Sequence, residues 1–151
     1  MSRTWIVGFD FSQHADHALA HAASLLEAVG GGRLIVVYVH ELLGLRVGMS
    51  GFHHSPSFDH VEEALIADAQ KTLVERVATV AARHPALEVT PRFEIGAPAD
   101  VITSLARSEQ AEQIVVGSHG RRGLNRLFLG SVAERVTRLS EVPVLVVKDA
   151  R

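Results

Sequence analysis

Short runs rich in β-branched residues alternate along this chain with longer stretches of helical spacing, and this alternation limits the possible folds more than any other feature. The runs that predict strands are Thr4–Phe9, Leu34–Val39, Leu87–Phe93, Ile114–Val116 and Val144–Val147. The stretches that predict helices are Gln13–Val29, His60–Arg83, Pro98–Ser108 and Ser131–Ser140. Strands that alternate with helices in this way predict an α/β fold, with a parallel sheet covered by helices on both faces.

Several residues at the ends of these stretches are typical of helix boundaries. Ser12 is expected to cap the first helix, and Gly30–Gly32 to end it. Asp59 and Glu62 stand in capping-box positions for the second helix. The eighteen residues of Glu41–Phe58 are long for a connection within a compact domain, so we expect this loop to be functional or mobile.

Composition narrows the class of protein. The length of 151 residues predicts a single domain over residues 1–151. A net charge of −2 argues against a nucleic-acid or membrane-surface partner, since both attract clustered positive charge. The absence of cysteine excludes disulfides, thiolate catalysis and zinc sites with sulfur ligands. With no long apolar run and no signal peptide in sight, we expect a cytoplasmic protein.

The stretch after the fourth predicted strand is the most informative for function. Gly117 and Gly120 follow the strand, and Gly130 and Ser131 stand where the next helix is expected to begin. Glycines let a ligand approach the backbone, and a helix N-terminus favours anions. The stretch carries Arg121, Arg122 and Arg126 and no acidic residue between Gln113 and Ala133. This combination suits a polyphosphate, although solvated arginines on a tight connection would produce the same composition.

These residues resemble the nucleotide-binding signature of the universal stress protein family. The spacing Gly117-x2-Gly120-x9-Gly130-Ser131 is similar to the family motif, and the likeness extends over the whole chain. It includes the opening Ile6-Val-Gly-Phe-Asp10, the run Val36-Val-Tyr-Val-His40 and the final Val142-Pro-Val-Leu-Val-Val-Lys148. The resemblance implies one five-stranded doubly wound sheet in the order 3-2-1-4-5, as in adenine nucleotide alpha hydrolase-like folds. In this order ligands bind where the strand order reverses.

The resemblance also implies ATP as the ligand, possible Mg²⁺ or Mn²⁺ with it, and a set of contact residues. Asp10 would accept a hydrogen bond from adenosine, with the adenine near Val39, and Gly130, Ser131 and Val132 would bind phosphates. The full set of nucleotide-binding candidates is Gly8, Phe9, Asp10, Val39, Val116, Gly117, His119, Gly120, Arg121, Gly130, Ser131 and Val132. Phe11 stands where the family commonly has glycine, so it would either crowd the mouth of the site or pack on the adenine.

The resemblance further implies a homodimer paired through Val144–Val147. We expect an unidentified protein partner to sense whether the site is occupied, through the loops Glu41–Phe58 and Arg121–Arg126. Neither a catalytic residue nor a metal site is predicted. His17 and His21 have the spacing of a metal pair, but a solvated helix edge is the simpler interpretation. Alternatives that remain open are slow ATP hydrolysis, binding of another adenine nucleotide such as a cyclic one, and a holdase-like role.

Overall fold

The computed structural model of the chain describes residues 3–42, 56–119 and 129–148. Along the chain the described elements are β1 (Thr4–Gly8), α1 (Gln13–Ala28), β2 (Gly32–His40), α3 (Pro56–Arg83), β3 (Leu87–Ile95), α4 (Pro98–Ser108), β4 (Gln113–Gly117), α5 (Ser131–Leu139) and β5 (Val144–Val147). None of the helices in these ranges is long and apolar enough to cross a membrane.

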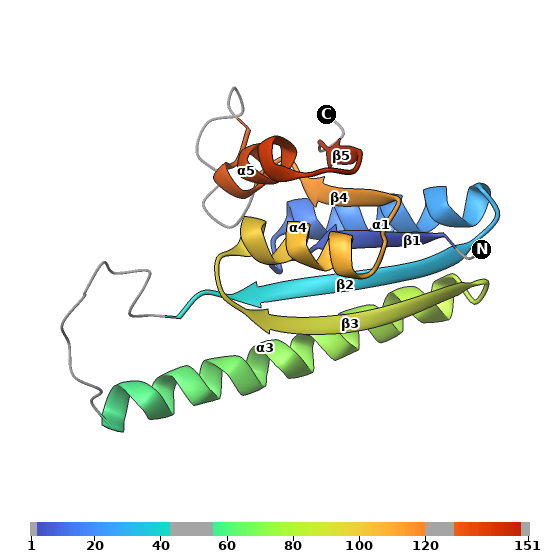
Figure 1. Cartoon of the computed structure of the whole chain (residues 1–151). Coiled ribbons are helices and arrows are strands. Elements are labelled where there is room, and N and C mark those ends of the chain that lie inside the picture. The colour runs from blue at the N-terminus through green and yellow to red at the C-terminus, as the bar shows by residue number, and fades with distance from the viewer. Residues whose placement is uncertain (1–2, 43–55, 120–128, 149–151) are drawn as a thin grey trace.

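The five strands form one parallel sheet in the order β3-β2-β1-β4-β5, which confirms the predicted fold (Figure 1). The order reverses at β1, because β2 pairs with one side of β1 and β4 with the other. Strands β3 and β5 are therefore the two edges. The central residues of β1, β2 and β4 are apolar because both faces of the sheet are covered there.

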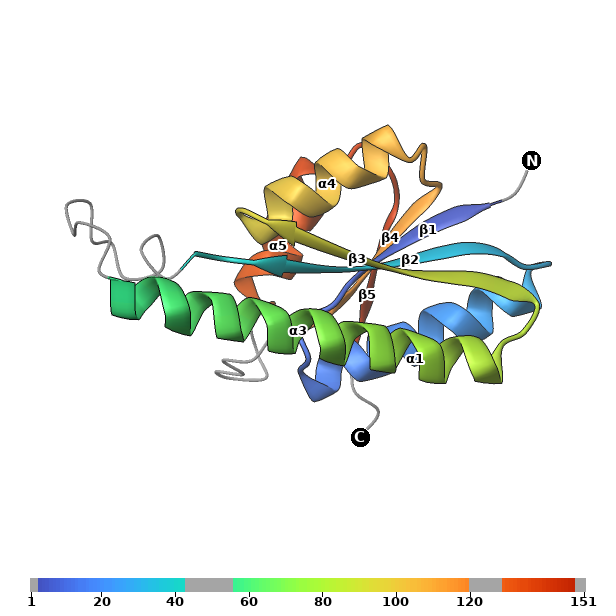
Figure 2. The same cartoon turned by 90° about the horizontal axis from the view of Figure 1, so that it is seen from below.

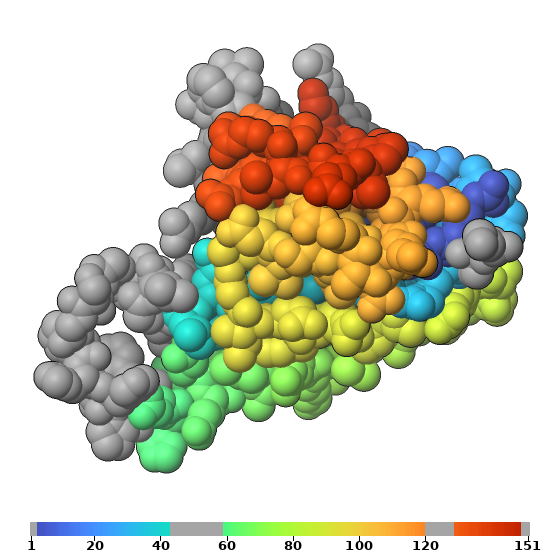
Figure 3. Space-filling model, viewed as in Figure 1, coloured from blue at the N-terminus to red at the C-terminus, as the bar shows by residue number. Residues whose placement is uncertain are grey.

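Helices α1 and α3 cover one face of the sheet, and α4 and α5 cover the other, as Figure 2 shows from below. The first face has a larger core, centred on Leu26, Leu34 and Leu73, each nearly or fully buried. The second face is packed around Ile6, Ile114 and Val136, also fully buried. Figure 3 shows α4 and α5 side by side over this second face. Alternate residues of β1, β2, β4 and β5 thus belong to different cores, whereas the core residues of β3 belong only to the first.

The predicted start of the second helix is wrong in detail. Helix α3 begins at Pro56, not near His60, so Asp59 lies in its first turn and the predicted capping box does not form. Proline suits a first helical turn because it has no N–H to lose, and the charge of Asp59 complements the helix dipole there. A helix of 28 residues is roughly 42 Å long, whereas the nine-residue β2 spans about 30 Å. The N-terminal turns of α3 consequently extend beyond the sheet (Figure 1).

The N-terminal caps of α1 and α5 differ. Ser12 caps α1 as predicted, since its side chain accepts a hydrogen bond from the amide of Ala15. Helix α5 is instead preceded by Gly130 and has no side-chain cap. Ser131 is therefore its first residue, with its side chain exposed.

Candidate functional site

The carboxyl ends of β1 and β4 lie next to each other at the point where the strand order reverses. From β1 the chain turns into α1, and from β4 it leads towards α5. In open α/β sheets this point is the common place for a ligand, because the two connections diverge and leave a crevice. Most of the predicted site residues in the described ranges lie at the ends of β1 and β4 or at the start of α5.

The turn between β1 and α1 is built around Asp10. Oδ1 of Asp10 accepts hydrogen bonds from the backbone amide and the hydroxyl of Ser12, the amide at 3.0 Å. Ser12 in turn caps α1, so the half-buried carboxylate is tied to the first turn of that helix. This arrangement gives Asp10 a structural role in addition to the predicted contact with a nucleoside.

Phe11 has a left-handed backbone conformation with φ of 63°. A bulky side chain is rare in this conformation, which explains why glycine would suit the position. The ring of Phe11 packs edge to face on the ring of Phe9, with 5.3 Å between the centroids. It also packs on the ring of Tyr38 in a tilted arrangement, with 4.7 Å between the centroids. The aromatic contacts offset the backbone strain, and they direct the ring to the core between the sheet and helices α1 and α3.

Gly117 permits close packing of α1 against the end of β4. A Cβ atom on Gly117 would lie 2.9 Å from the carbonyl oxygen of His14 and 3.1 Å from its Cβ. At Gly8 a Cβ atom would meet Ile102 Cδ1 at 3.0 Å and Val116 Cγ1 at 3.2 Å, both side-chain atoms. The sequence interpretation assigned both glycines to ligand approach; in the structure each also has a packing reason.

The start of α5 is held against the end of β4. The amide of Gly130 donates to the carbonyl of Ser118 at 2.8 Å, and the first helical hydrogen bond runs from Glu134 to Gly130. The amides of Ser131, Val132 and Ala133 precede that bond and have no partner within the helix. Since the amide of Gly130 is already used, the donors that this helix end presents begin at Ser131.

The predicted residues are divided between the two faces of the sheet. The side chains of Val39 and Val116 belong to the core under α4 and α5, on the same face as the start of α5. Phe9 is 3% exposed and belongs to the opposite core, so its side chain is structural. Val132 is partly exposed on the first turn of α5. Gly120 and Arg121 lie outside the described residues, as do Arg122, Arg126 and most of the loop Glu41–Phe58.

Two histidine contacts near this end of the sheet were not predicted. His14 and His119 face each other with ring centroids 5.3 Å apart. His40, 6% exposed at the end of β2, has its Nε2 atom 3.4 Å from Oε1 of Glu62. In the sequence these partners are separated by 105 and 22 residues, and no spacing rule connects them. Only the paired strand ends and the N-terminal turns of α1 and α3 bring them together.

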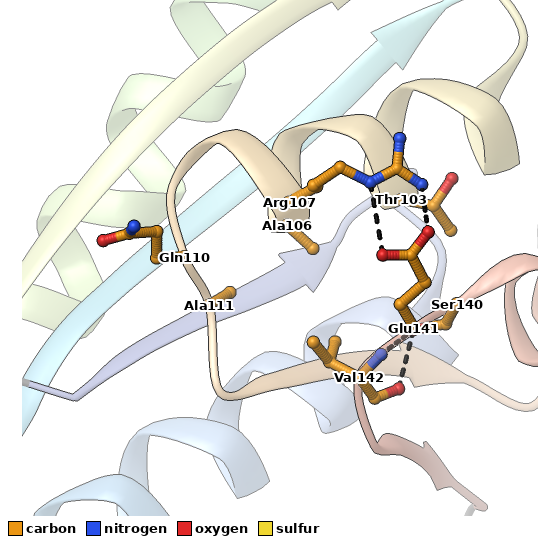
Figure 4. A pocket seen from close by; sticks show the side chains of 8 residues that line it. All are labelled: Thr103, Ala106, Arg107, Gln110, Ala111, Ser140, Glu141 and Val142. Atoms are coloured by element: carbon orange, nitrogen blue, oxygen red, sulfur yellow. Dashed lines mark hydrogen bonds and ion pairs between the residues drawn. The ribbon is translucent and has the colours of Figure 1, made fainter.

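A hollow of about 240 Å³ lies elsewhere, between the C-terminal end of α4 and the connection from α5 to β5 (Figure 4). Its charged groups are already paired, since Arg107 forms an ion pair with Glu141 at 2.6 Å, and the Ser140 hydroxyl donates to the carbonyl of Val142 at 2.7 Å. It lies where β4 and β5 begin, away from the crevice at their carboxyl ends. The paired groups make it a packing feature.

Comparison with known proteins supports the family resemblance. The model of the universal stress protein family matches residues 1–148. A universal stress protein from Thermus aquaticus is 33% identical over 98% of this chain and 100% of its own length. The solved structure of MJ0577, a universal stress protein of Methanocaldococcus jannaschii, superposes with a TM-score of 0.83 at 25% identity, covering 100% of this chain and 99% of that one.

Two more distant structures of the same fold contain adenine nucleotides. One is a universal stress protein in complex with cAMP, with a TM-score of 0.66, and the other is an Archaeoglobus fulgidus protein in complex with dAMP, with a TM-score of 0.62. Each is 24% identical to this chain, and each alignment covers 97% of both chains.

Proposed function

This chain belongs to the universal stress protein family, and we propose that it is a regulatory protein that binds an adenine nucleotide, ATP first among them, in the crevice between β1 and β4. The observation that carries the proposal is the hydrogen bond from Gly130 to Ser118, which holds the start of α5 beside the end of β4. Amides that have no partner within the helix and the positive end of the helix dipole then lie near the point where the strand order reverses. That relatives are described with dAMP and cAMP supports the ligand class.

In the proposed complex the phosphates lie on the amides of Ser131 and Val132. The nucleoside lies towards Asp10, on the side of the sheet where Val39 and Val116 contribute to the core. Nucleotide occupancy would be read by a protein partner, whose identity the chain does not indicate. Of the two lysines in the chain, Lys71 is on α3 and Lys148 directly follows β5.

The sharpest test removes a single amide without disturbing the helix. Ser131→Pro deletes the N–H at the first helical position, where proline is favoured, and the ψ of 149° at Gly130 suits a residue before proline. Ser131→Ala is the matched control, because both variants lack the hydroxyl and only the proline variant lacks the amide. A charged hydrogen bond is worth about 1.5–3 kcal/mol, so we expect ATP to bind about 10-fold to 100-fold more weakly to Ser131→Pro than to Ser131→Ala.

Calorimetric titration of nucleotide-stripped protein with ATP, with and without Mg²⁺, measures the affinity, and thermal unfolding checks that both variants fold. Equal affinity of the two variants would refute the role of the α5 amides. The absence of heat and of a thermal shift with millimolar ATP, AMP and cAMP would refute nucleotide binding altogether.

We also propose that the protein is a homodimer through the edge strand β5. Its four residues Val144–Val147 are all apolar and half-buried, and an apolar edge invites pairing with a second strand. The carbonyls of Pro143 and Val147 bond towards β4, so in a parallel ladder the N–H and C=O groups of Val144 and Val146 point away from the sheet.

Val146→Pro therefore removes an outward N–H and leaves the ladder to β4 intact, as proline is tolerated on an edge strand in that orientation. We expect sedimentation equilibrium to show a dimer for the wild type and for the control Val146→Thr, and a weakened dimer for Val146→Pro. A monomeric wild type, or an unchanged dimer in the proline variant, would contradict pairing through β5.

A further inference from the structure

We propose that His14 and His119 together bind a divalent transition-metal ion of the zinc type. His14 is the second residue of α1, and His119 follows β4 by two residues. Their ring centroids lie 5.3 Å apart with the planes tilted by 46°. Two imidazoles bound to one tetrahedral ion, with metal–nitrogen distances of about 2.0–2.1 Å, place their ring centroids roughly 5 Å apart. The spacing of these two rings therefore suits a shared ion.

The second observation is a buried nitrogen of His119. Nε2 is shielded from solvent and has no hydrogen-bond partner among the described residues. A buried polar atom without a partner is costly and calls for an explanation, of which a bound ion is one. The other ring nitrogen, Nδ1, lies 3.0 Å from the hydroxyl of the buried Ser118. A hydrogen bond at one nitrogen is what orients an imidazole that binds metal through the other.

Other inward histidines of the described chain have a different environment. His40 is next to Glu62, and Nδ1 of His84 lies 2.8 Å from a carboxylate oxygen of Glu27. A carboxylate satisfies one imidazole, whereas His119 faces a second imidazole. A metal ion is the partner that two imidazoles can share, and imidazole selects zinc, copper and nickel over magnesium and calcium.

The backbone holds the two rings in place. Because Gly117 has no side chain, the first turn of α1 lies directly on the end of β4, with the backbone of His14 against Gly117. The two ligands thus come from a helix and from a residue just beyond a strand. Within the described residues no group of three or more histidine, cysteine, aspartate or glutamate side chains could hold a metal, so the proposed site rests on these two imidazoles. The proposal does not require a bound nucleotide, although His119 is also one of the predicted nucleotide-binding residues.

The test is titration of the whole, nucleotide-free protein with Zn²⁺ alone. Calorimetry gives the affinity, and NMR of the histidine side chains identifies the nitrogens that bind. We expect one equivalent of zinc to shift the resonances of His14 and His119 together. His14→Asn and His119→Asn should abolish this event. Ser118→Ala should weaken it by about tenfold, since Ser118 orients the ring of His119.

The matched control is the double variant His17→Asn, His21→Asn, which removes the exposed pair spaced for metal binding on the same helix. We expect it to keep the wild-type zinc affinity. The proposal would be overturned if this control lost the binding, or if zinc left the rings of His14 and His119 unshifted in the wild type. The second readout uses the unaltered chain, so it holds even if a variant fails to fold.

Discussion

The two ends of the sheet differ in whether their buried polar atoms have hydrogen-bond partners and in whether a helix ending explains their left-handed residue. At the amino end of β4, Gln110 is left-handed with φ of 50° because it closes the C-terminus of α4. The amide of Ala111 reaches back to the carbonyl of Ala106 at 2.8 Å, which is the usual helix ending. The ion pair of Arg107 and Glu141 lies beside it (Figure 4). This end has a hollow, and its described residues include no buried side-chain polar atom without a hydrogen-bond partner.

The carboxyl end has the opposite character. Phe11 is left-handed without any helix to close, and Nε2 of His119 has no partner in the described chain. The first amides of α5 precede the helical hydrogen bonds. Strain and unsatisfied groups persist where something else stabilises them or binds to them. In this protein, polar groups without partners therefore point to a candidate binding site better than the volume of a hollow does.

The largest effect that would sharpen this comparison is expected for Gly117→Val. Any side chain at this position collides with the backbone of α1, and a helix backbone cannot move aside as a side chain can. We expect a loss of roughly 2–3 kcal/mol in the free energy of unfolding, measured with urea. Gly8→Ala is the matched control, because its Cβ meets only side-chain atoms, and it should lose about 1 kcal/mol. Equal losses would show that α1 is not pinned there.

The smaller effects come from glycine at the two left-handed positions, where we expect opposite signs. Phe11→Gly relieves backbone strain but removes a ring that packs on Phe9 and Tyr38, so unfolding should be easier by about 1–2 kcal/mol. Gln110→Gly relieves similar strain on an exposed side chain, so stability should rise by about 0.5 kcal/mol. Both are measured by urea unfolding. Gln110→Ala, which keeps the strain, should leave stability unchanged; the same sign at both positions would contradict the comparison.

Most of the architecture could be predicted from the sequence because it rests on local patterns. Five apolar runs and the helical stretches between them predicted every described strand and helix, with boundaries wrong by a few residues, most at Pro56. The order of the strands came from the family resemblance, since periodicity does not specify which strands pair. Ser12 was predicted correctly as a cap, because a cap depends on a residue and its neighbours within one turn.

The site was less predictable, because its residues act through contacts that are distant in sequence. The sequence showed a glycine at position 117, but the contact that requires it is with the backbone of His14. That contact depends on how α1 crosses β4. The sequence suggested His17 and His21 as the possible metal pair because spacing along one helix can be recognised without a structure. The tertiary structure instead brings His14 to His119, across a helix and a strand.

By itself the sequence determined the α/β class, the family and the residues available at the crevice, since these follow from short-range periodicity and from a motif. Only the tertiary structure decided which of those residues meet. The amide of Gly130 donates to the carbonyl of Ser118. The side chains of Phe9 and Phe11 pack in the core under α1 and α3, whereas those of Val39 and Val116 pack in the core under α4 and α5. The physical reason is that the direction of a side chain and the crossing of two elements depend on packing between those elements. This packing cannot be deduced from a residue's neighbours along the chain.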